Sequence, residues 1–138
     1  MSTTDVAKVL RWIPARNIML IADSCYSGSF TKEQQVEKAD ASANFEDLRD
    51  LRGVLALSSG GEEPVMDGAV NSPFSRALSN RLIAVTTAVV GEELFQKVRD
   101  DVTAAAPQTP QYGVISSAGY DLGADYSFEK RGKRVSAR

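Results

Sequence analysis

Two short apolar runs stand out along the chain. They are IMLIA at positions 18–22 and VLAL at positions 54–57, and both are continuous rather than alternating. Continuous runs of this length are typical of strands buried on both faces, as in parallel sheets. Residues 17–22 and 54–57 are therefore predicted to be strands, and 112–116 is predicted to be a third, shorter strand.

Three further segments show helical periodicity, with apolar residues spaced three or four positions apart. The first follows Thr3 and Thr4 as candidate caps and is ended by Pro14. The second opens with Ser72 as cap and Pro73 in the first turn, and the third covers about 92–105. The inward-facing positions are predicted to be Val6, Val9, Leu10 and Ile13; Phe74, Ala77, Leu78 and Leu82; and Leu94, Phe95, Val98 and Val102.

The predicted fold class is α/β, with a mostly parallel sheet flanked by helices. The 17–22 strand is expected at an edge of that sheet, where it would leave apolar surface exposed. Residues 31–50 are polar and charged, and they are predicted to form a long mobile loop with a short helix near 45–51. The domain is expected to span 1–128, followed by a basic tail at 129–138.

The overall composition excludes several classes of partner. The 138 residues carry a net charge of −2, which gives no argument for binding nucleic acid. Neither a membrane-spanning run nor a secretory signal is present, so no membrane partner is expected. A single cysteine cannot form an internal disulfide, and a reducing cytoplasmic location is the simplest interpretation.

The only cysteine, Cys25, lies in the segment DSCYSG at positions 23–28, directly after the first predicted strand. Catalytic groups collect at the carboxyl ends of strands in open α/β sheets, so Cys25 stands where a nucleophile is expected. A Cys-His peptidase also needs an imidazole to generate the thiolate, and the chain contains no histidine. Composition alone leaves open that Cys25 is an inert buried thiol.

Four segments, in order, resemble the caspase-like cysteine peptidases of the metacaspase and bacterial caspase-homologue branch. They are DSCYSG at 23–28, LALSSGGEEPVMD at 55–67, SPFSRAL at 72–78 and QTPQYG at 108–113. The resemblance covers about residues 3–128 and implies the C-terminal part of a caspase-like catalytic domain. Gly28 comes three residues after Cys25, whereas the Asp-specific caspases have a glycine two residues after their cysteine. The spacing therefore resembles the metacaspase-like branch more than the Asp-specific caspases.

The resemblance implies that Cys25 is the nucleophile and that its backbone N–H contributes to the oxyanion hole. The family carries its catalytic histidine on the preceding strand, about 50 residues upstream in caspases. Only 24 residues precede Cys25, so the N-terminal strands, including the histidine-bearing one, are expected to be absent. The chain is then the nucleophile-bearing part of a cysteine endopeptidase and inactive alone. The alternative is a non-catalytic, caspase-like regulatory or protein-binding module.

The resemblance also implies a substrate pocket lined by Asp23 and Asp67. Two carboxylates in one pocket select Arg or Lys before the scissile bond. Glu62 and Glu63 remain alternatives for the second acid. Ser58 and Ser59 either form the pocket wall or are small residues that let the loop pass, and the sequence does not choose between these roles.

The expected partners are a peptide or protein substrate and a histidine-bearing N-terminal fragment, or a second copy of the chain at the open sheet edge. An enzyme that cuts after basic residues could cleave itself in or beside the charged loop, where the candidates are Lys32, Lys38, Arg49 and Arg52. The resemblance supports this, because members of the family are often processed in the corresponding linker; the alternative is a solvated loop that stays uncut. No cofactor or metal site is expected from the residues. Some relatives in the family need Ca²⁺, but no EF-hand spacing occurs here.

Overall fold

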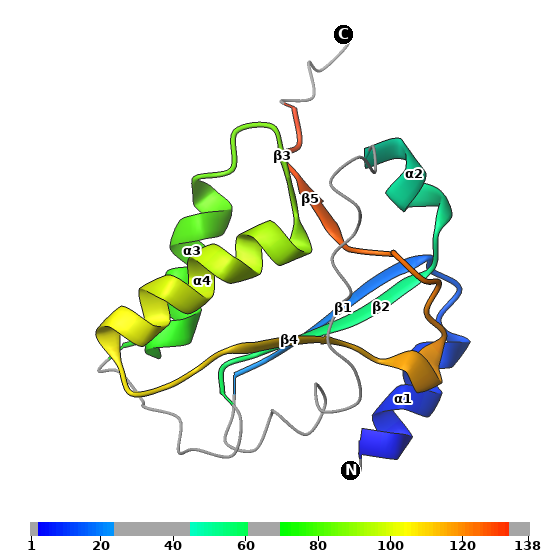
Figure 1. Cartoon of the computed structure of the whole chain (residues 1–138), viewed down its shortest axis with the longest axis horizontal. Helices are drawn as coiled ribbons and strands as arrows, with labels where there is room; N and C mark the ends of the chain where they lie inside the picture. Colours follow the sequence, from blue (N-terminus) through cyan, green and yellow to red (C-terminus); the bar gives the residue numbers. More distant parts are fainter. Residues whose placement is uncertain (1–2, 24–44, 61–69, 133–138) are drawn as a thin grey trace, which may run out of the picture.

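A computed structural model of the chain describes residues 3–23, 45–60 and 70–132. These residues form a mixed α/β structure with four α-helices, a three-stranded sheet and a smaller two-stranded sheet (Figure 1). In chain order the elements are α1 (Thr3–Trp12), β1 (Asn17–Ala22), α2 (Phe45–Asp50), β2 (Gly53–Ser58), α3 (Pro73–Ile83), β3 (Ala88–Val90), α4 (Gly91–Ala105), β4 (Gln111–Val114), the 3₁₀-helix η2 (Ser116–Ala118) and β5 (Ser127–Glu129).

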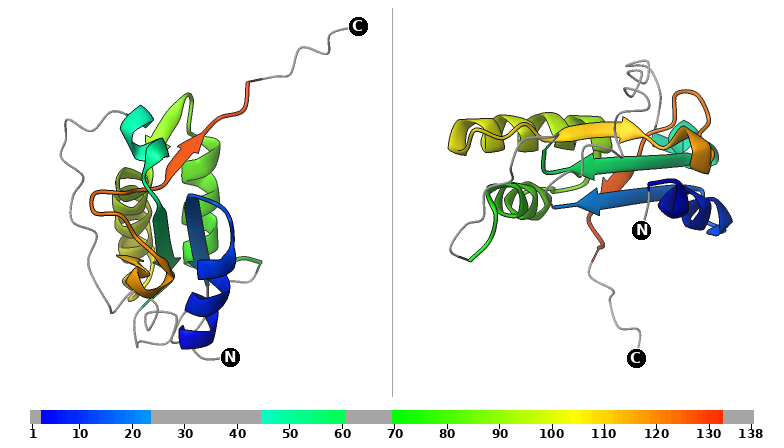
Figure 2. Two further views of the ribbon diagram at one scale, coloured as in Figure 1. Left: turned by 90° about the vertical axis from the view of Figure 1, so that its right-hand side faces the viewer. Right: turned by 90° about the horizontal axis from the view of Figure 1, so that it is seen from below.

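The main sheet has the order β1-β2-β4, and its strands lie side by side in the right-hand view of Figure 2. β1 and β2 are parallel, from Asn17 opposite Gly53 to Ala22 opposite Ser58. β4 is antiparallel to β2, with Leu55 opposite Val114, so the main sheet is mixed and the expectation of a mostly parallel sheet is not confirmed.

The direction of β4 follows from the two helices that precede it. α3 carries the chain away from the end of β2, and α4 brings it back to the same end of the sheet (Figure 1). β4 therefore enters beside Ser58, which pairs with Gln111, and must run against β2. A single crossover helix would have returned the chain to the other end and produced a parallel strand.

β1 lies at an edge of the main sheet, as predicted for the cysteine-bearing strand. Every residue of β2 is buried, whereas the residues of β1 are only partly buried and the Ile21 side chain is 43% exposed. Within the part of the chain that the structure describes, β1 pairs with β2 alone. An apolar strand with one unpaired edge is a site where another strand can add.

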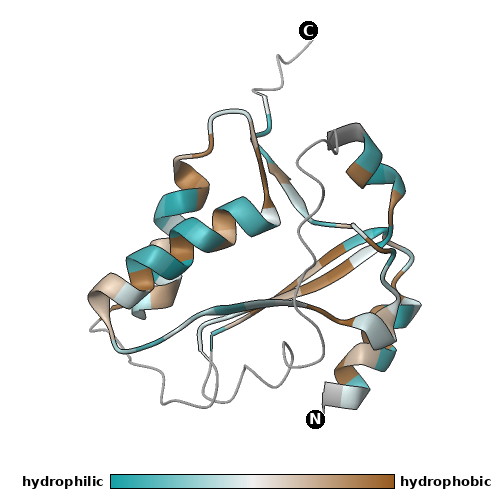
Figure 3. Ribbon diagram, in the orientation of Figure 1, coloured by the Kyte–Doolittle hydropathy of each residue, from teal (hydrophilic) through white to brown (hydrophobic). Residues whose placement is uncertain are grey.

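The two faces of the main sheet carry separate hydrophobic cores. One core packs Leu57 against α3 and α4, and the other packs Val54 and Ala56 against α1. The predicted inward faces of α3 and α4 are confirmed, with Leu82 only partly buried at the margin. Figure 3 shows hydrophobic and hydrophilic stretches alternating along α4, as expected for a helix with one buried face.

The first helix departs from its predicted pattern. Val6 and Leu10 are buried as expected, but Val9 is 60% exposed and Ile13 lies just beyond the end of the helix. Ala7 takes the third buried position instead. A short helix needs only a narrow apolar stripe, so one residue of the periodic set can face solvent.

The β3–β5 pair was not predicted from the sequence. Each strand has three residues, and Val89 lies opposite Phe128. Strands this short give too few positions for a period to be recognised. β5 also extends to Glu129, one residue past the predicted end of the domain at position 128.

A buried carboxylate joins β4, the start of α4 and the segment before β5. Asp125 Oδ1 accepts hydrogen bonds from the Tyr112 hydroxyl at 2.6 Å and the Tyr126 amide at 2.7 Å, and Oδ2 accepts one from the Glu92 amide at 3.1 Å. Burial, and secondly the charge of Asp125, raises the pKa of Tyr112 well above its ordinary value. The phenol therefore stays protonated and keeps donating, which fixes the C-terminal segment against α4.

Candidate functional site

The carboxyl ends of β1 and β2 lie side by side, because the two strands are parallel and in register. The Ser59 amide donates a hydrogen bond to the Ala22 carbonyl at 3.0 Å, which continues the pairing one step past both strands. Asp23 follows directly after Ala22. The structure thus brings three of the predicted site residues, Asp23, Ser58 and Ser59, to one edge of the sheet.

Asp23 is exposed, and the N-cap residue of α3 anchors it. The Ser72 hydroxyl donates a hydrogen bond to Asp23 Oδ2. Ser72 is also the N-cap of α3, and its Oγ accepts the amide of Ser75 at 2.9 Å. Within residues 3–23, 45–60 and 70–132, no basic side chain pairs with this carboxylate. The negative charge of Asp23 is therefore available to a cationic ligand.

The two serines at the end of β2, Ser58 as its last residue and Ser59 directly after it, are buried in different ways. Ser58 Oγ donates to the Gly60 carbonyl at 3.2 Å, which is the local role of a small residue in a turn. Ser59 is fully buried, and its Oγ has no hydrogen-bond partner among the described residues. A buried hydroxyl without a partner is uncommon in folded proteins.

Gln108 supports the same edge from the segment before β4. Its side chain is buried, and Nε2 donates to the Ser59 carbonyl at 2.6 Å. From the sequence, Gln108 was recognised only as part of a motif, and Ser72 only as a helix cap and as part of a motif. Neither contact has a local sequence signal, because Gln108 and Ser59 are 49 positions apart, as are Ser72 and Asp23.

Several other predicted site residues lie outside the described residues. They are Cys25, Asp67, Lys32 and Lys38, together with the alternative acids Glu62 and Glu63. The assignment of Cys25 as nucleophile and of Asp67 as second pocket acid therefore remains a prediction from the sequence.

The remaining two candidate cleavage positions, Arg49 and Arg52, have different surroundings. Arg49 lies on α2 and forms an exposed ion pair with Glu129. The Arg52 guanidinium donates to the Ala15 carbonyl at 2.6 Å and to Leu10 at 3.3 Å at the end of α1. Cleavage after Arg52 would require these contacts to break, so among the described candidates Arg49 is the more accessible one.

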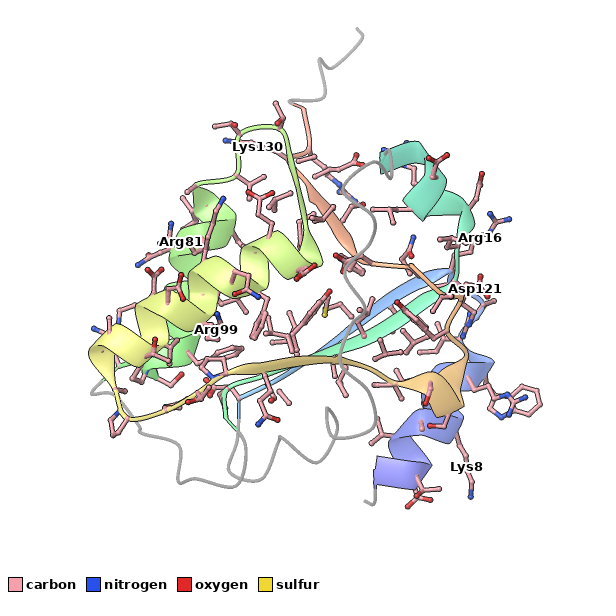
Figure 4. All side chains as sticks on the ribbon, in the orientation of Figure 1. Lys8, Arg16, Arg81, Arg99, Asp121 and Lys130 are labelled. Carbon is pink, nitrogen blue, oxygen red and sulfur yellow. The ribbon has the colours of Figure 1, made fainter. Side chains whose placement is uncertain are left out.

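The Arg52 backbone is held as well. Its amide donates to Asp121 Oδ2 at 2.7 Å, and Asp121 is labelled at the right of Figure 4. The guanidinium also reaches the Ala118 carbonyl in η2 at 3.4 Å. Arg52 thus fastens α1 and η2 to the start of β2, which is a structural role that the sequence did not reveal.

A surface hollow lies at the other end of β1, away from Asp23. Its volume is about 770 Å³, and its lining includes Asn17, Leu82, Phe128 and Lys130. Lys130 is labelled at the top of Figure 4. The hollow is therefore separated from Asp23 by the length of the strand and is not part of the candidate site.

The described residues offer no group of three His, Cys, Asp or Glu side chains that could hold a metal ion. In the same residues, no helix has the length and apolar character needed to cross a membrane.

Comparison of the chain with protein-family models, with curated proteins and with solved structures found no match. The resemblance to caspase-like peptidases therefore rests on the residues of the sequence, and the function built on it is a proposal.

Proposed function

We propose that this chain is the nucleophile-bearing part of a caspase-like cysteine endopeptidase that cleaves after Arg or Lys, and that its α/β structure is part of a caspase-like fold. The observation that supports this best is the position of Asp23, the first residue of the DSCYSG segment. It lies at the carboxyl edge of two parallel strands, where its carboxylate is exposed and has no basic partner among the described residues. Catalytic and binding groups collect at this edge in α/β proteins.

In the proposed reaction the Cys25 thiolate attacks the carbonyl carbon of the scissile bond. The carbonyl oxygen becomes an oxyanion, to which the Cys25 backbone N–H donates. An imidazole from another segment takes the thiol proton and then gives it to the leaving amine, so the first product departs and a thioester remains. Water hydrolyses that thioester and regenerates the thiol. The 138-residue chain has no histidine, so it supplies the nucleophile but not the base.

The proposed specificity rests on charge. Asp23, with Asp67 as the second acid, would place negative charge around the side chain before the scissile bond. A guanidinium or ammonium satisfies these acids, whereas a neutral side chain leaves them desolvated and unpaired. Ser59 is fully buried and would support this edge from beneath, because its backbone is fixed by Ala22 and Gln108.

Profiling on a peptide library tests the proposed function. The chain is joined to, or co-expressed with, a caspase-like segment whose strand ends in His-Gly. We expect cleavage after Arg and Lys and none after Asp. A preference for acidic or apolar residues before the cut would contradict the pocket assignment. If the joined, folded protein cleaves no peptide at all, the proposed peptidase activity is contradicted.

A second candidate function is a non-catalytic module that binds a partner by strand addition. The half-exposed edge strand β1 favours it, since its far side has no partner in the described part of the chain. The same edge could receive the histidine-bearing segment or a second copy of the chain. The two functions thus share this docking edge and differ in whether Cys25 reacts.

Self-association of the 138-residue chain is the expected consequence of that edge. Sedimentation velocity should show a dimer fraction that grows with concentration. Ile21→Lys should shift the chain toward monomer, because a charge at an exposed position of an edge strand opposes pairing with another strand. Leu122→Lys is the matched control, since Leu122 is exposed outside the main sheet. A monomer at every concentration, with all β1 amides protected from hydrogen exchange, would argue against an open edge.

A further inference from the structure

The N-cap residue of α3 contributes more than packing to the candidate site. We propose that Ser72 is a positioning residue: its hydroxyl holds the Asp23 carboxylate in the orientation that receives the substrate cation. This inference rests on the proposed function and adds to it a residue that had been assigned from the sequence only to the start of a helix.

The geometry defines the direction of each hydrogen bond. The Ser75 amide can only donate, so it occupies a lone pair of Ser72 Oγ at 2.9 Å. The Ser72 proton is then free to point at Asp23 Oδ2, which accepts it. The two hydrogen bonds, from the Ser75 amide to the Ser72 hydroxyl and from that hydroxyl to the Asp23 carboxylate, run in the same direction. Hydrogen bonds linked in this way strengthen one another.

The anchor is rigid because α3 is rigid. Pro73 restricts the backbone at the first helical position, and Phe74, 1% exposed, packs in the core with Ala77 and Leu78. Asp23, by contrast, follows the last residue of an edge strand and is exposed. Without Ser72 its carboxylate would be free to rotate, and binding a cation would cost the entropy of fixing that side chain.

The two carboxylate oxygens of Asp23 have different roles in this arrangement. Oδ2 is occupied by Ser72, and Oδ1 has no hydrogen-bond partner among the described residues. A substrate guanidinium or ammonium would therefore bind Oδ1 while Oδ2 stays attached to α3. Loss of the Ser72 hydroxyl should weaken substrate binding without changing the chemistry at Cys25.

Three substitutions separate this role from helix capping. Ser72→Thr keeps the hydroxyl and the cap. Ser72→Gly keeps most of the capping preference but has no hydroxyl, and Ser72→Ala loses both. If Ser72 only capped α3, Gly would behave like Thr. If Ser72 positions Asp23, the Ser72→Gly variant will bind substrate as weakly as Ser72→Ala, while its thermal stability stays close to that of the wild type.

The test uses the joined enzyme and an Arg peptide substrate, with Asp23→Ala as a second background. We expect Ser72→Gly and Ser72→Ala to raise KM about 5- to 10-fold with kcat nearly unchanged, the pattern of lost binding, and Ser72→Thr to stay near wild type. In the Asp23→Ala background Ser72→Gly should have no further effect, because the two residues act as one unit.

The outcomes distinguish this inference from the function on which it rests. If the joined enzyme does not cleave after Arg or Lys, the proposed function is wrong, and this inference is wrong with it. If Asp23→Ala abolishes the Arg preference while Ser72→Gly leaves KM unchanged, the function stands and the positioning role is wrong. An equal KM increase from Ser72→Gly with and without Asp23 would also overturn the positioning role.

Discussion

The 138-residue chain alone should release no measurable product from Arg or Lys peptide substrates, because it contains no histidine. An unperturbed thiol has a pKa of about 8.5 and is only a few per cent ionised at pH 7. In the caspase-like peptidases that the chain resembles, the second oxyanion donor comes from a glycine beside the histidine, and one such donor contributes about 10²–10³ in rate. Under the proposed function, the chain alone therefore lacks both the base and half of the oxyanion hole.

Joining the histidine-bearing segment should restore hydrolysis, and Cys25→Ala should abolish it, with a loss of at least about 10⁴-fold in kcat/KM. Ser79→Ala, an exposed serine on α3, is the matched control and should leave the rate unchanged. Initial rates on a fluorogenic Arg peptide provide the measurement. Turnover by the homogeneous 138-residue chain, lost in Cys25→Ala, would show that the missing imidazole is not required.

Asp23→Ala in the joined enzyme should lower kcat/KM for Arg substrates by about 10- to 100-fold, corresponding to about 1.5–3 kcal/mol for a charge-assisted hydrogen bond. The reason is that Asp23 offers an exposed carboxylate with no cationic partner in the described residues. Asp100→Ala removes an acid that is exposed on α4 and should have no effect on the Arg preference.

Asp67→Ala tests the second acid of the same pocket, and its effect should equal or fall below that of Asp23→Ala. Hydrolysis of matched Arg, Lys, Gln and Asp peptides gives the comparison. An Asp23→Ala variant that keeps the full Arg preference would remove the pocket assignment while leaving the assignment of Cys25 intact.

Much of the fold could be predicted because its signals are local. The cap Ser72, Pro73 and the spacing of Phe74, Ala77 and Leu78 lie within two turns of α3, and the structure has all of them in the predicted roles. The continuous apolar run of β1 likewise marks a strand whatever surrounds it. Its place at the sheet edge was also predicted correctly.

The direction of β4 could not be predicted in this way. Residues 111–114 have the same side-chain pattern whether the strand runs with β2 or against it. The direction depends on α3 and α4 together returning the chain to the end of β2, which is a property of the path of the chain. The three-residue strands β3 and β5 form only because each has the other as partner.

In the candidate site, too, the features with local sequence signals could be predicted and the contacts between distant residues could not. Parallel pairing of β1 and β2 was expected, and it places Asp23 and Ser59 at one edge. The contacts of Ser72 with Asp23 and of Gln108 with Ser59 join residues 49 positions apart, so only the folded chain reveals them. The role of Arg52 was hidden for the same reason, since its partners lie at the end of α1 and in η2.

Covalent labelling tests most directly the central claim that Cys25 is the nucleophile of an Arg/Lys-specific peptidase. The joined enzyme is treated with a peptidyl-arginine chloromethyl ketone, digested and analysed by mass spectrometry. The proposed function predicts one thioether adduct on Cys25, formed in parallel with loss of activity and slowed by Asp23→Ala. Complete loss of activity with Cys25 unmodified, or equal labelling by the matching aspartyl probe, would contradict it.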